Sequence, residues 1–315
     1  TNIYNSSFVK NTADFQGGAV YTGKTAKSAN FYESTFDGNG LKNRAGNYYG
    51  GAIFEADLIR KCTFINNYAW SGGAIYQWYY HSDNRLRIEN STFNNNTALG
   101  TGGAVYAHYG ARILDSNFTN NRAGDVGGAV GGWNHISFKC LFINNSAKSG
   151  GAIGGESARA YENLIINSTA TYLGGAIYGF NLIVTDNMII NSSSNNLGGA
   201  IGTSEYFDAT STFKNNTIIN AKALKGGAAY FYNHANGIKT VFDSNKIFNV
   251  TAEIGGAIYT HSIATLSNNI FSNTNASTGG VIYNDLNLTV KNNTVVDSKA
   301  DLGRDIYNIN SIGIS

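Results

Sequence analysis

The sequence predicts an all-β fold, a right-handed parallel β-helix of about twelve coils that takes up residues 1–315 as a single domain. Three observations lead to this prediction. A Gly-Gly pair recurs along the whole chain, a Phe-x-x-Asn motif precedes most of the pairs, and a short stretch of alternating apolar and polar residues precedes that motif. Alternation at every second residue is the periodicity of a β-strand, and a repeat of nearly fixed length indicates a solenoid.

The Gly-Gly pair marks the period of the repeat. The shortest spacing is 22 residues, from Gly50 to Gly72, and several others are 24, as from Gly150 to Gly174. The residue three places after the first glycine is Val or Ile in every pair except one, where it is Ala229. Longer spacings indicate insertions. The pairs begin at Gly17, Gly50, Gly72, Gly102, Gly127, Gly150, Gly174, Gly198, Gly226, Gly255 and Gly279, and a degenerate copy begins at Gly303.

The Phe-x-x-Asn motif reads FINN at Phe64 and FNNN at Phe93, and it drifts to IINS and VVDS in later copies. Helical periodicity and the Leu/Asn ladder of a leucine-rich repeat are both lacking, so each repeat is predicted to form one β-helical coil. Coils stack at about 4.8 Å, and the usual chirality of parallel crossovers makes the helix right-handed. Equivalent residues then lie above one another, so aliphatic side chains fill the interior and corner Asn residues form amide ladders.

Composition and charge exclude several classes of protein. Only 13% of the residues are charged and the formal net charge is +2, so no basic field is available for nucleic acid or an anionic membrane. No run of about 20 apolar residues is present, so no membrane insertion is expected in this segment. No signal segment opens the chain and its first residues already look like the middle of a repeat, so we expect a fragment of a larger surface protein.

The paired GGAI and Phe-x-x-Asn motifs resemble the repeats of the chlamydial polymorphic outer membrane proteins. They are equally similar to the repeats of adhesin-like surface proteins of methanogenic archaea. The resemblance covers nearly the whole chain, and the high Asn content and the lack of Pro favour the archaeal group. Both families imply a surface-displayed β-helix, of the pectate-lyase-like kind, that takes part in attachment. The chain departs from them in showing no anchor and no autotransporter barrel.

Two short motifs suggest other chemistry. The segment GAVYTGKT, residues 18–25, fits the phosphate-binding pattern G-x-x-x-x-G-K-[ST], with Lys24 and Thr25 in the functional places. That pattern requires a helix directly after it, and a loop and a strand are expected instead, so a nucleotide site is not predicted. Cys62 and Cys140 share one repeat position but lie three coils apart, beyond disulfide reach, so both are predicted to be buried free thiols.

Neither a metal nor another cofactor is predicted, and no catalytic residue is assigned. The histidines follow Gly pairs without any metal-binding spacing. A β-helical enzyme acting on polysaccharides would need carboxylates on neighbouring coils, and the best pair is Glu156 and Glu205, two coils and roughly 10 Å apart, near the wide end for an inverting enzyme. A chance pairing of two surface acids is the alternative. The histidines are His81, His108, His135, His234 and His261.

Aromatic side chains form the candidate binding face. If the strand after each Gly pair keeps alternating, the residues four and six places after the first glycine point away from the interior. Flat, amphipathic rings along a face suit contact with sugars and proteins. Rings that form a purely structural ladder, or that are covered by the insertions, are the alternative. The candidate ligand-binding residues are Tyr76, Trp78, Tyr106, His108, Trp133, Glu156 and Phe180.

The predicted function is non-catalytic attachment. The chain is expected to be an extracellular, cell-surface module that binds surface glycans or proteins of another cell or host through several weak lateral contacts. Small residues at Gly154, Gly155, Gly202 and Ser204 interrupt the aromatic columns and suggest a shallow groove. A carbohydrate-active β-helix enzyme and a purely structural stalk are the alternatives. Uncapped coil ends expose strand edges, so end-to-end self-association is a further expectation.

Overall fold

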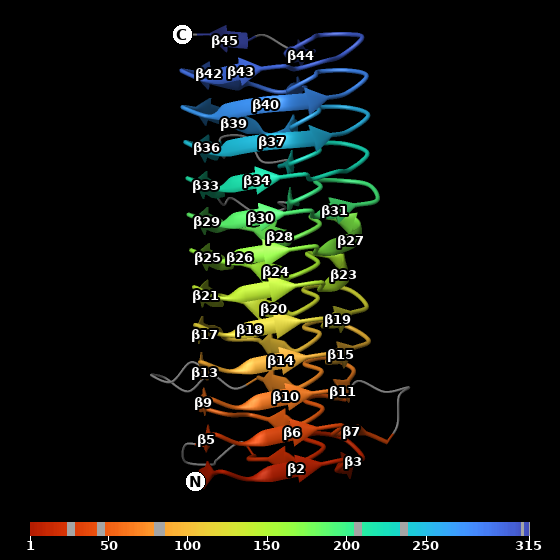
Figure 1. The fold of residues 1–315 in the computed structure, drawn as a ribbon, viewed down its shortest axis with the longest axis vertical. Coiled ribbons are helices and arrows are strands. Elements are labelled where there is room, and N and C mark those ends of the chain that lie inside the picture. Colours follow the sequence, from red (N-terminus) through yellow and green to blue (C-terminus); the bar gives the residue numbers. More distant parts are fainter. Residues whose placement is uncertain are drawn as a thin grey trace. The chain divides into compact units, whose positions relative to one another are not determined.

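The computed structural model describes residues 1–23, 29–42, 48–78, 86–204, 210–233, 239–309 and 312–314. In these residues the chain is all-β, and short parallel strands stack as a β-solenoid of about twelve turns, as the repeat predicts (Figure 1). The chain divides into two compact units, residues 1–155 and 156–315, which are described one at a time. Each turn, here called a coil, contributes to parallel sheets that we name A to D in chain order.

In the first unit every coil contributes a strand to each of the four sheets. Sheet A contains β1 (Asn2–Tyr4), β5 (Asn30–Tyr32), β9 (Leu58–Arg60), β13 (Leu86–Glu89), β17 (Ala111–Leu114) and β21 (Ile136–Phe138). Sheet B contains β2 (Ser7–Val9), β6 (Thr35–Asp37), β10 (Thr63–Ile65), β14 (Thr92–Asn94), β18 (Asn117–Thr119) and β22 (Leu141–Ile143). Sheet C contains β3 (Thr12–Ala13), β7 (Gly40–Leu41), β11 (Tyr68–Ala69), β15 (Thr97–Ala98), β19 (Arg122–Ala123) and β23 (Ser146–Ser149). Sheet D contains β4 (Val20–Tyr21), β8 (Ile53–Phe54), β12 (Ile75–Gln77), β16 (Val105–Ala107), β20 (Val130–Trp133) and β24 (Ile153–Glu156).

In the second unit sheet C is short and the other three sheets continue. Sheet A contains β25 (Arg159–Tyr161), β29 (Ile183–Thr185), β33 (Thr212–Lys214), β36 (Lys239–Asp243), β39 (Ile263–Ser267), β42 (Leu288–Lys291) and β45 (Ile312–Ile314). Sheet B contains β26 (Leu164–Ile166), β30 (Met188–Ile190), β34 (Thr217–Ile219), β37 (Lys246–Thr251), β40 (Ile270–Asn275) and β43 (Thr294–Val296). Sheet C contains β27 (Thr169–Leu173) and β31 (Ser193–Ser194). Sheet D contains β28 (Ile177–Phe180), β32 (Ile201–Thr203), β35 (Ala229–Tyr232), β38 (Ile258–His261), β41 (Ile282–Asn284) and β44 (Ile306–Asn308).

Left-handed residues turn the chain at the two corners that flank sheet B. In the coil of β10, Lys61 at the first corner has φ 54° and Asn66 at the second corner has φ 56°. Side chains other than Gly rarely adopt this conformation, and Asn tolerates it better than most. The recurrent need for such residues explains much of the high Asn content of the chain.

Stacked phenylalanines fill the interior of the first unit behind sheet B. Phe64 is fully buried and pairs in register with Phe36 and Phe93. The ring centroids of these neighbours are 4.7 and 4.8 Å apart, and the rings are nearly parallel. The Phe of the repeat motif therefore fixes the register of sheet B, because each ring packs against its equivalent in the next coil.

An amide ladder runs along the second corner of the first unit, as predicted. The Oδ1 atom of buried Asn96 accepts hydrogen bonds from the backbone N and the Nδ2 of Asn67, at 3.0 and 2.9 Å. Its Nδ2 donates to the Phe64 carbonyl and to Asn121 Oδ1. Both amide hydrogens and the oxygen are thus satisfied in the interior, which makes burial of this polar side chain tolerable.

The amide ladder changes corner between the units. In the first unit the buried first-corner residues are Ser or Cys, such as Ser91, whose Oγ accepts from Cys62 N. In the second unit the first corner holds Asn instead, and Asn216 repeats the same pattern with Asn245 and the Val184 carbonyl. The second-unit ladder consists of Asn163, Asn187, Asn216, Asn245, Asn269 and Asn293.

Each glycine of the Gly pair has a separate reason to be glycine. Gly72 has φ 61°, and a Cβ there would lie 2.2 Å from the Ile75 carbonyl oxygen. Gly73 has no positive φ, but a Cβ there would lie 2.1 Å from the carbonyl oxygen of Gly103 in the next coil. The first glycine therefore allows the turn, and the second allows close approach of two coils.

Candidate aromatic binding face

Sheet D of the first unit brings three of the predicted site residues into one column. Register pairs Tyr76 with Tyr106, and Tyr106 with Gly131. The residues two places further along are Trp78, His108 and Trp133, which therefore follow one another in successive coils. We call these three residues the Trp-His-Trp ladder.

The rings of the Trp-His-Trp ladder stack on one another. The centroids of Trp78 and His108 are 4.1 Å apart with an angle of 21° between the planes. Those of His108 and Trp133 are 4.4 Å apart with an angle of 33°. Trp78 and Trp133 are 40% and 44% exposed, whereas His108 is half-buried. The ring faces between neighbouring members of the ladder are covered by this stacking. The ring edges are therefore exposed to solvent.

Hydrogen bonds hold this ladder in position. His108 Nδ1 and the Tyr106 hydroxyl are 3.1 Å apart, and the backbone N of Trp78 donates to Oε1 of buried Glu55 at 2.8 Å. Burial lowers the pKa of His108, so the ring is favoured in its neutral form. A neutral imidazole between two indoles makes the column an amphipathic surface with little charge.

Tyr76 does not belong to the accessible surface, contrary to the predicted outward column. It is only 3% exposed, because its ring stacks on Tyr49 at 4.3 Å and on Tyr106 at 4.7 Å. Tyr49 is the residue before a Gly pair, and it reaches across from the preceding coil. Tyr76 therefore supports the ladder from beneath and cannot itself contact a ligand, whereas Tyr106 is half-buried beside His108.

Glu156 and Phe180 belong to the second unit, and each is the last residue of its strand, β24 and β28 respectively. Both side chains are half-buried. The two coils are joined where Ser157 N donates to the Phe180 carbonyl at 2.9 Å. Glu205, the predicted partner of Glu156 in a carboxylate pair, lies outside the described residues, as do His81, His234, Lys24 and Thr25.

A second ladder occupies the same column in the second unit and was not among the predicted site residues. The rings of Tyr232 and His261 stack at 5.0 Å, and His261 Nδ1 is 2.8 Å from Asp285 Oδ1. Tyr232, His261 and Asp285 each lie six places after the first glycine of a pair, so aligning the repeats places them in one column. A common role could not be predicted from the sequence, because the three side chains are a phenol, an imidazole and a carboxylate.

Residues on other columns were missed because they lie outside the alternating strand. Tyr109 follows the ladder residue directly and packs edge-on against His108 at 4.5 Å. Trp70, 36% exposed, stands two places before a Gly pair, in the same position as Tyr48 and exposed Phe15 of the preceding coils. Phe15 and Tyr48 form an edge contact at 5.7 Å. Aligning the residues before each Gly pair would have revealed this row.

The shallow groove expected at the glycines is not formed, because neighbouring side chains occupy the space. A Cβ on Gly154 would lie 2.5 Å from Val126 Cγ1, and one on Gly202 would lie 2.4 Å from Leu173 Cδ1. Val126 and Leu173 stand directly before Gly pairs, in the position of Tyr49. These glycines therefore make room for the preceding coil, and they leave no opening for a ligand.

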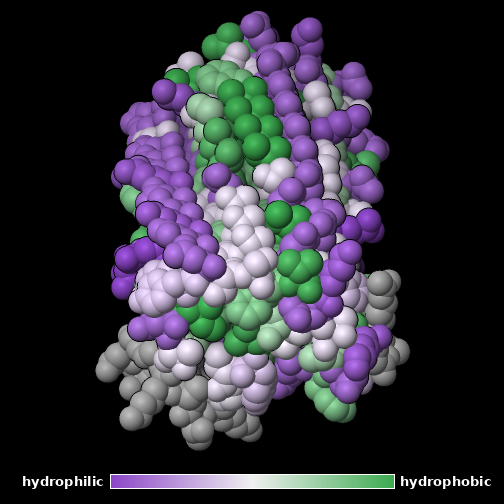
Figure 2. All heavy atoms as spheres, turned by 60° about the horizontal axis from the view of Figure 1, so that its bottom comes forward, coloured by the Kyte–Doolittle hydropathy of each residue, from purple (hydrophilic) through white to green (hydrophobic). Residues whose placement is uncertain are grey.

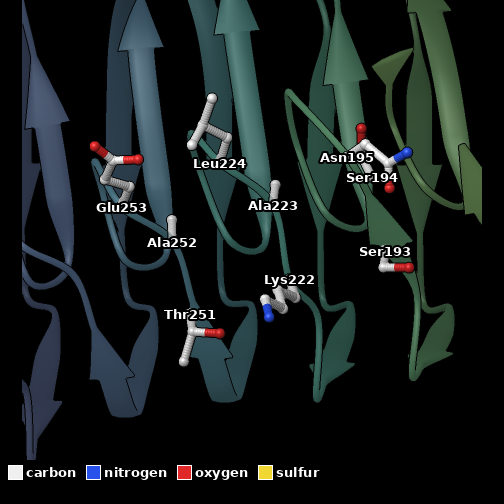
Figure 3. A pocket seen from close by; sticks show the side chains of 9 residues that line it. All are labelled: Ser193, Ser194, Asn195, Lys222, Ala223, Leu224, Thr251, Ala252 and Glu253. Atoms are coloured by element: carbon white, nitrogen blue, oxygen red, sulfur yellow. The ribbon is translucent and has the colours of Figure 1, made fainter. Parts of the chain in front are cut away.

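The second unit has a hollow elsewhere, on the side of the coils that follows sheet B in the chain (Figure 3). It has a volume of ≈ 740 Å³ and is open to solvent. Figure 3 shows its side chains on three neighbouring coils, with Lys222 central in one row and Leu224 central in the other. The charged residues among those that line it are Lys222 and Glu253. Glycoside hydrolysis uses a pair of carboxylates, and this lining supplies a single one. The lining consists of Ser193, Ser194, Asn195, Lys222, Ala223, Leu224, Thr251, Ala252 and Glu253.

The remaining singled-out residues are structural. Cys62 and Cys140 are free and buried, as predicted, and burial raises the pKa of the Cys140 thiol to about 12. His135 is fully buried, and its Nε2 lies 3.2 Å from the Gly154 carbonyl oxygen.

Among the described residues, no three His, Cys, Asp or Glu side chains gather into a set able to hold a metal. The same residues include no helix of the length and hydropathy that a membrane span requires.

Comparison with known proteins gives one family match. Three segments, residues 61–77, 90–108 and 139–156, match the repeat of the Chlamydia polymorphic membrane proteins. Each segment begins at the first corner of a coil and continues through sheets B, C and D. No curated protein and no solved structure gives a significant match. The chain therefore carries the chlamydial polymorphic-membrane-protein type of repeat in three coils, on a parallel β-solenoid.

Proposed function

We propose that the chain is a non-catalytic, surface-displayed attachment module that binds glycans or proteins of another cell through the Trp-His-Trp ladder of sheet D. The repeat match supports this proposal, because the polymorphic membrane proteins are surface-displayed and take part in attachment. The archaeal adhesin-like proteins, which have similar repeats, suggest the same kind of role.

The exposure of Trp78 and Trp133 is the observation that carries the proposal. Each indole is two-fifths or more exposed, although a coil forms equally well with Ala56 at the same position. An exposed indole contributes little to the fold through burial, so its retention on two of three neighbouring coils favours a role in contact. Trp is also a side chain that supplies large contact area at low entropic cost.

The stacking of the rings limits the kind of contact that the ladder makes. The inner faces of Trp78 and Trp133 are turned towards His108, so a ligand meets ring edges, indole N–H groups and outer faces. Apolar patches of sugar rings and apolar protein side chains both suit such a surface. Affinity per site is expected to be weak, with strength arising from many copies on a surface.

Binding of the purified chain to a glycan array and to a panel of intact cells tests the proposal. We expect the Trp78→Ala/Trp133→Ala variant to lose at least about tenfold in apparent affinity. Trp70→Ala is the matched control, because Trp70 has nearly the same exposure (36%) but lies on another column. Circular dichroism of all variants confirms that the coils remain folded.

Binding that persists in the double variant would refute the ladder as the contact surface. A lack of binding on both the array and the cells would leave the ladder with a structural role, as in a stalk. Turnover of a bound polysaccharide, seen as shortened chains, would instead support the enzymatic alternative and would redirect attention to Glu156.

A further inference from the structure

An apolar stripe covers the outer face of sheet B in the second unit. The inward-pointing residues of its five strands β26, β30, β34, β37 and β40 are fully buried, so the residues on either side of each of them face outward. The inward residues are Ile165, Ile189, Ile218, Ile247 and Phe271. Seven of these outward residues are large and apolar, and we call them the sheet B stripe. They are Leu164, Ile166, Met188, Ile190, Ile219, Phe248 and Ile270.

The members of the stripe are neighbours in register. Ile166 pairs with Ile190, Ile190 with Ile219, and Ile219 with Phe248, while Leu164 pairs with Met188. Met188 and Ile270 are 44% and 37% exposed, and the other members are half-buried. In Figure 2, apolar side chains gather between hydrophilic columns on the surface. A continuous patch of this kind with a polar rim is typical of an interaction surface.

The fold of a coil does not require this stripe. In the first unit the outward positions of β10, β14 and β18 are mostly polar, with Thr63, Thr92 and Asn117 in one column and Ile65, Asn94 and Thr119 in the other. The apolar pair Leu141 and Ile143 appears only in β22, the last sheet B strand of that unit. The strands there keep the same length, register and buried Phe. Because polar residues serve the coil equally well, the apolar residues of the second unit call for a partner that covers them.

The rim of the stripe is chemically self-complementary. Along the second corner exposed Asn side chains dominate, and Asn220 Nδ2 donates to Asn191 Oδ1 at 2.9 Å. Amides donate and accept, so the same surface can face itself without like-charge repulsion. Along the first corner and its adjoining strand, exposed Asp186 and exposed Lys246 carry opposite charges two coils apart.

We propose that the sheet B stripe is the interface between two copies of this chain, packed face to face and antiparallel about the coil of β34. A two-fold axis along that strand places the coil of β30 in one copy opposite the coil of β37 in the other. Lys246 of each copy then stands opposite Met188 and Asp186 of the other, and Ile219 packs against its own equivalent. The interface is isologous, so each charge pair forms twice.

The size of the face sets the strength of association. Five coils at about 4.8 Å, and six residues at about 3.3 Å from the first-corner Asp186 to the second-corner Asn191, give a face of roughly 480 Å² per copy with its rim included. Stable complexes bury about 800 Å² per partner, so we expect a reversible dimer with a dissociation constant in the micromolar range.

Sedimentation equilibrium of the full chain at concentrations up to about 100 µM tests the proposal. We expect Ile190→Thr/Ile219→Thr to weaken the dimer at least about tenfold, because Thr keeps the strand propensity and copies the residues of the first unit. Ile65→Thr is the matched control, since Ile65 occupies the same outward column in the first unit. A chain that stays monomeric throughout, or that dimerises equally well with both Thr substitutions, overturns the proposal.

A charge exchange tests the antiparallel register. Lys246→Asp and Asp186→Lys should each weaken the dimer, because each places like charges opposite one another, and the double variant should restore it. Failure of the double variant to recover would exclude this register. A dimer lost through Trp78→Ala but not through the Thr substitutions would locate self-association on the aromatic ladder instead. Attachment through the ladder is measured separately, so the two proposals can fail independently.

Discussion

The imidazole of His108 lies face to face with the indole of Trp78, with ring centroids 4.1 Å apart, and Trp133 covers its other side at 4.4 Å. The histidine is therefore the central ring of a stack whose two outer members are exposed. Its position follows from the parallel register of β12, β16 and β20 in sheet D. The arrangement connects the solenoid repeat directly to the candidate binding face.

Removal of the central ring should disorganise the exposed indoles. We expect His108→Ala to lower the free energy of unfolding by about 1 kcal/mol, because two aromatic contacts are lost. Binding in the attachment assay should fall as well. His108→Phe keeps a flat ring and should retain both properties. Denaturant midpoints and near-ultraviolet circular dichroism check this, and equal behaviour of the Ala and Phe variants would contradict the role of stacking.

The buried amide ladder should be far more sensitive to substitution than the exposed corner residues. Asn96→Ala removes the acceptor of Asn67 N and Nδ2 and leaves buried donors unsatisfied, so we expect a loss of about 3 kcal/mol. The neighbouring Asn95 is exposed with φ 55°, and Asn95→Gly should cost less than about 1 kcal/mol because Gly adopts this φ freely. Denaturant midpoints of both variants give the comparison, and similar losses would contradict the ladder's importance.

The second glycine of the pair should tolerate no side chain at all. In Gly73→Ala the new Cβ would meet the Gly103 carbonyl oxygen at 2.1 Å, so coils must separate and folding should be lost or strongly impaired. Gly38→Ala is the control, because Gly38 has φ 65° but a Cβ there meets only Lys10 Cγ at 3.4 Å. That variant should cost roughly 1–2 kcal/mol through backbone strain alone. Thermal unfolding distinguishes the two, and a well-folded Gly73→Ala protein would contradict the close-packing argument.

Stability should fall on mild acidification because of His135. Burial lowers the pKa of this histidine to about 4, below its value of about 6.5 in the unfolded chain. As the pH falls, His135 is therefore protonated in the unfolded state before it is protonated in the folded state. The stability contributed by the neutral ring is complete above pH 6.5 and is lost as the pH falls towards 4. The loss should approach roughly 3 kcal/mol.

Comparison of the wild type with His135→Gln isolates this effect from the other titrating groups. The difference in unfolding free energy between the two proteins should change in favour of the variant as the pH is lowered from 7 to about 4.5. Urea titrations across this range measure the difference. Parallel pH profiles would show that His135 is not responsible.

The solenoid could be predicted from the sequence because its determinants repeat. The Gly pair, the inward Phe64 column and the corner Asn residues each recur with the coil period, and each has one physical role. The positions of Cys62 and Cys140 followed from the same alignment. The family of chlamydial repeats was likewise visible in these motifs, whereas the archaeal resemblance stays a prediction.

The features that escaped prediction depend on contacts between coils. Tyr76 is buried because the ring of Tyr49, the residue directly before the preceding Gly pair, stacks on it. Strand alternation alone does not reveal this contact. The change of the amide ladder from the corner of Asn96 to that of Asn216 was present in the motif drift from FINN to IINS. Its meaning appears only when both corners are aligned, because Asn moves to the first corner while Ser, Ala, Val or Thr takes its place at the second.

The most direct test of the attachment proposal observes the indoles during binding. The chain has three tryptophans, so its indole N–H signals in an NMR spectrum can be assigned with single substitutions. On titration with a glycan or protein ligand found by the binding screen, we expect the signals of Trp78 and Trp133 to shift and that of Trp70 to stay in place. Saturable binding that leaves Trp78 and Trp133 unshifted would contradict the assignment of the contact surface to the Trp-His-Trp ladder.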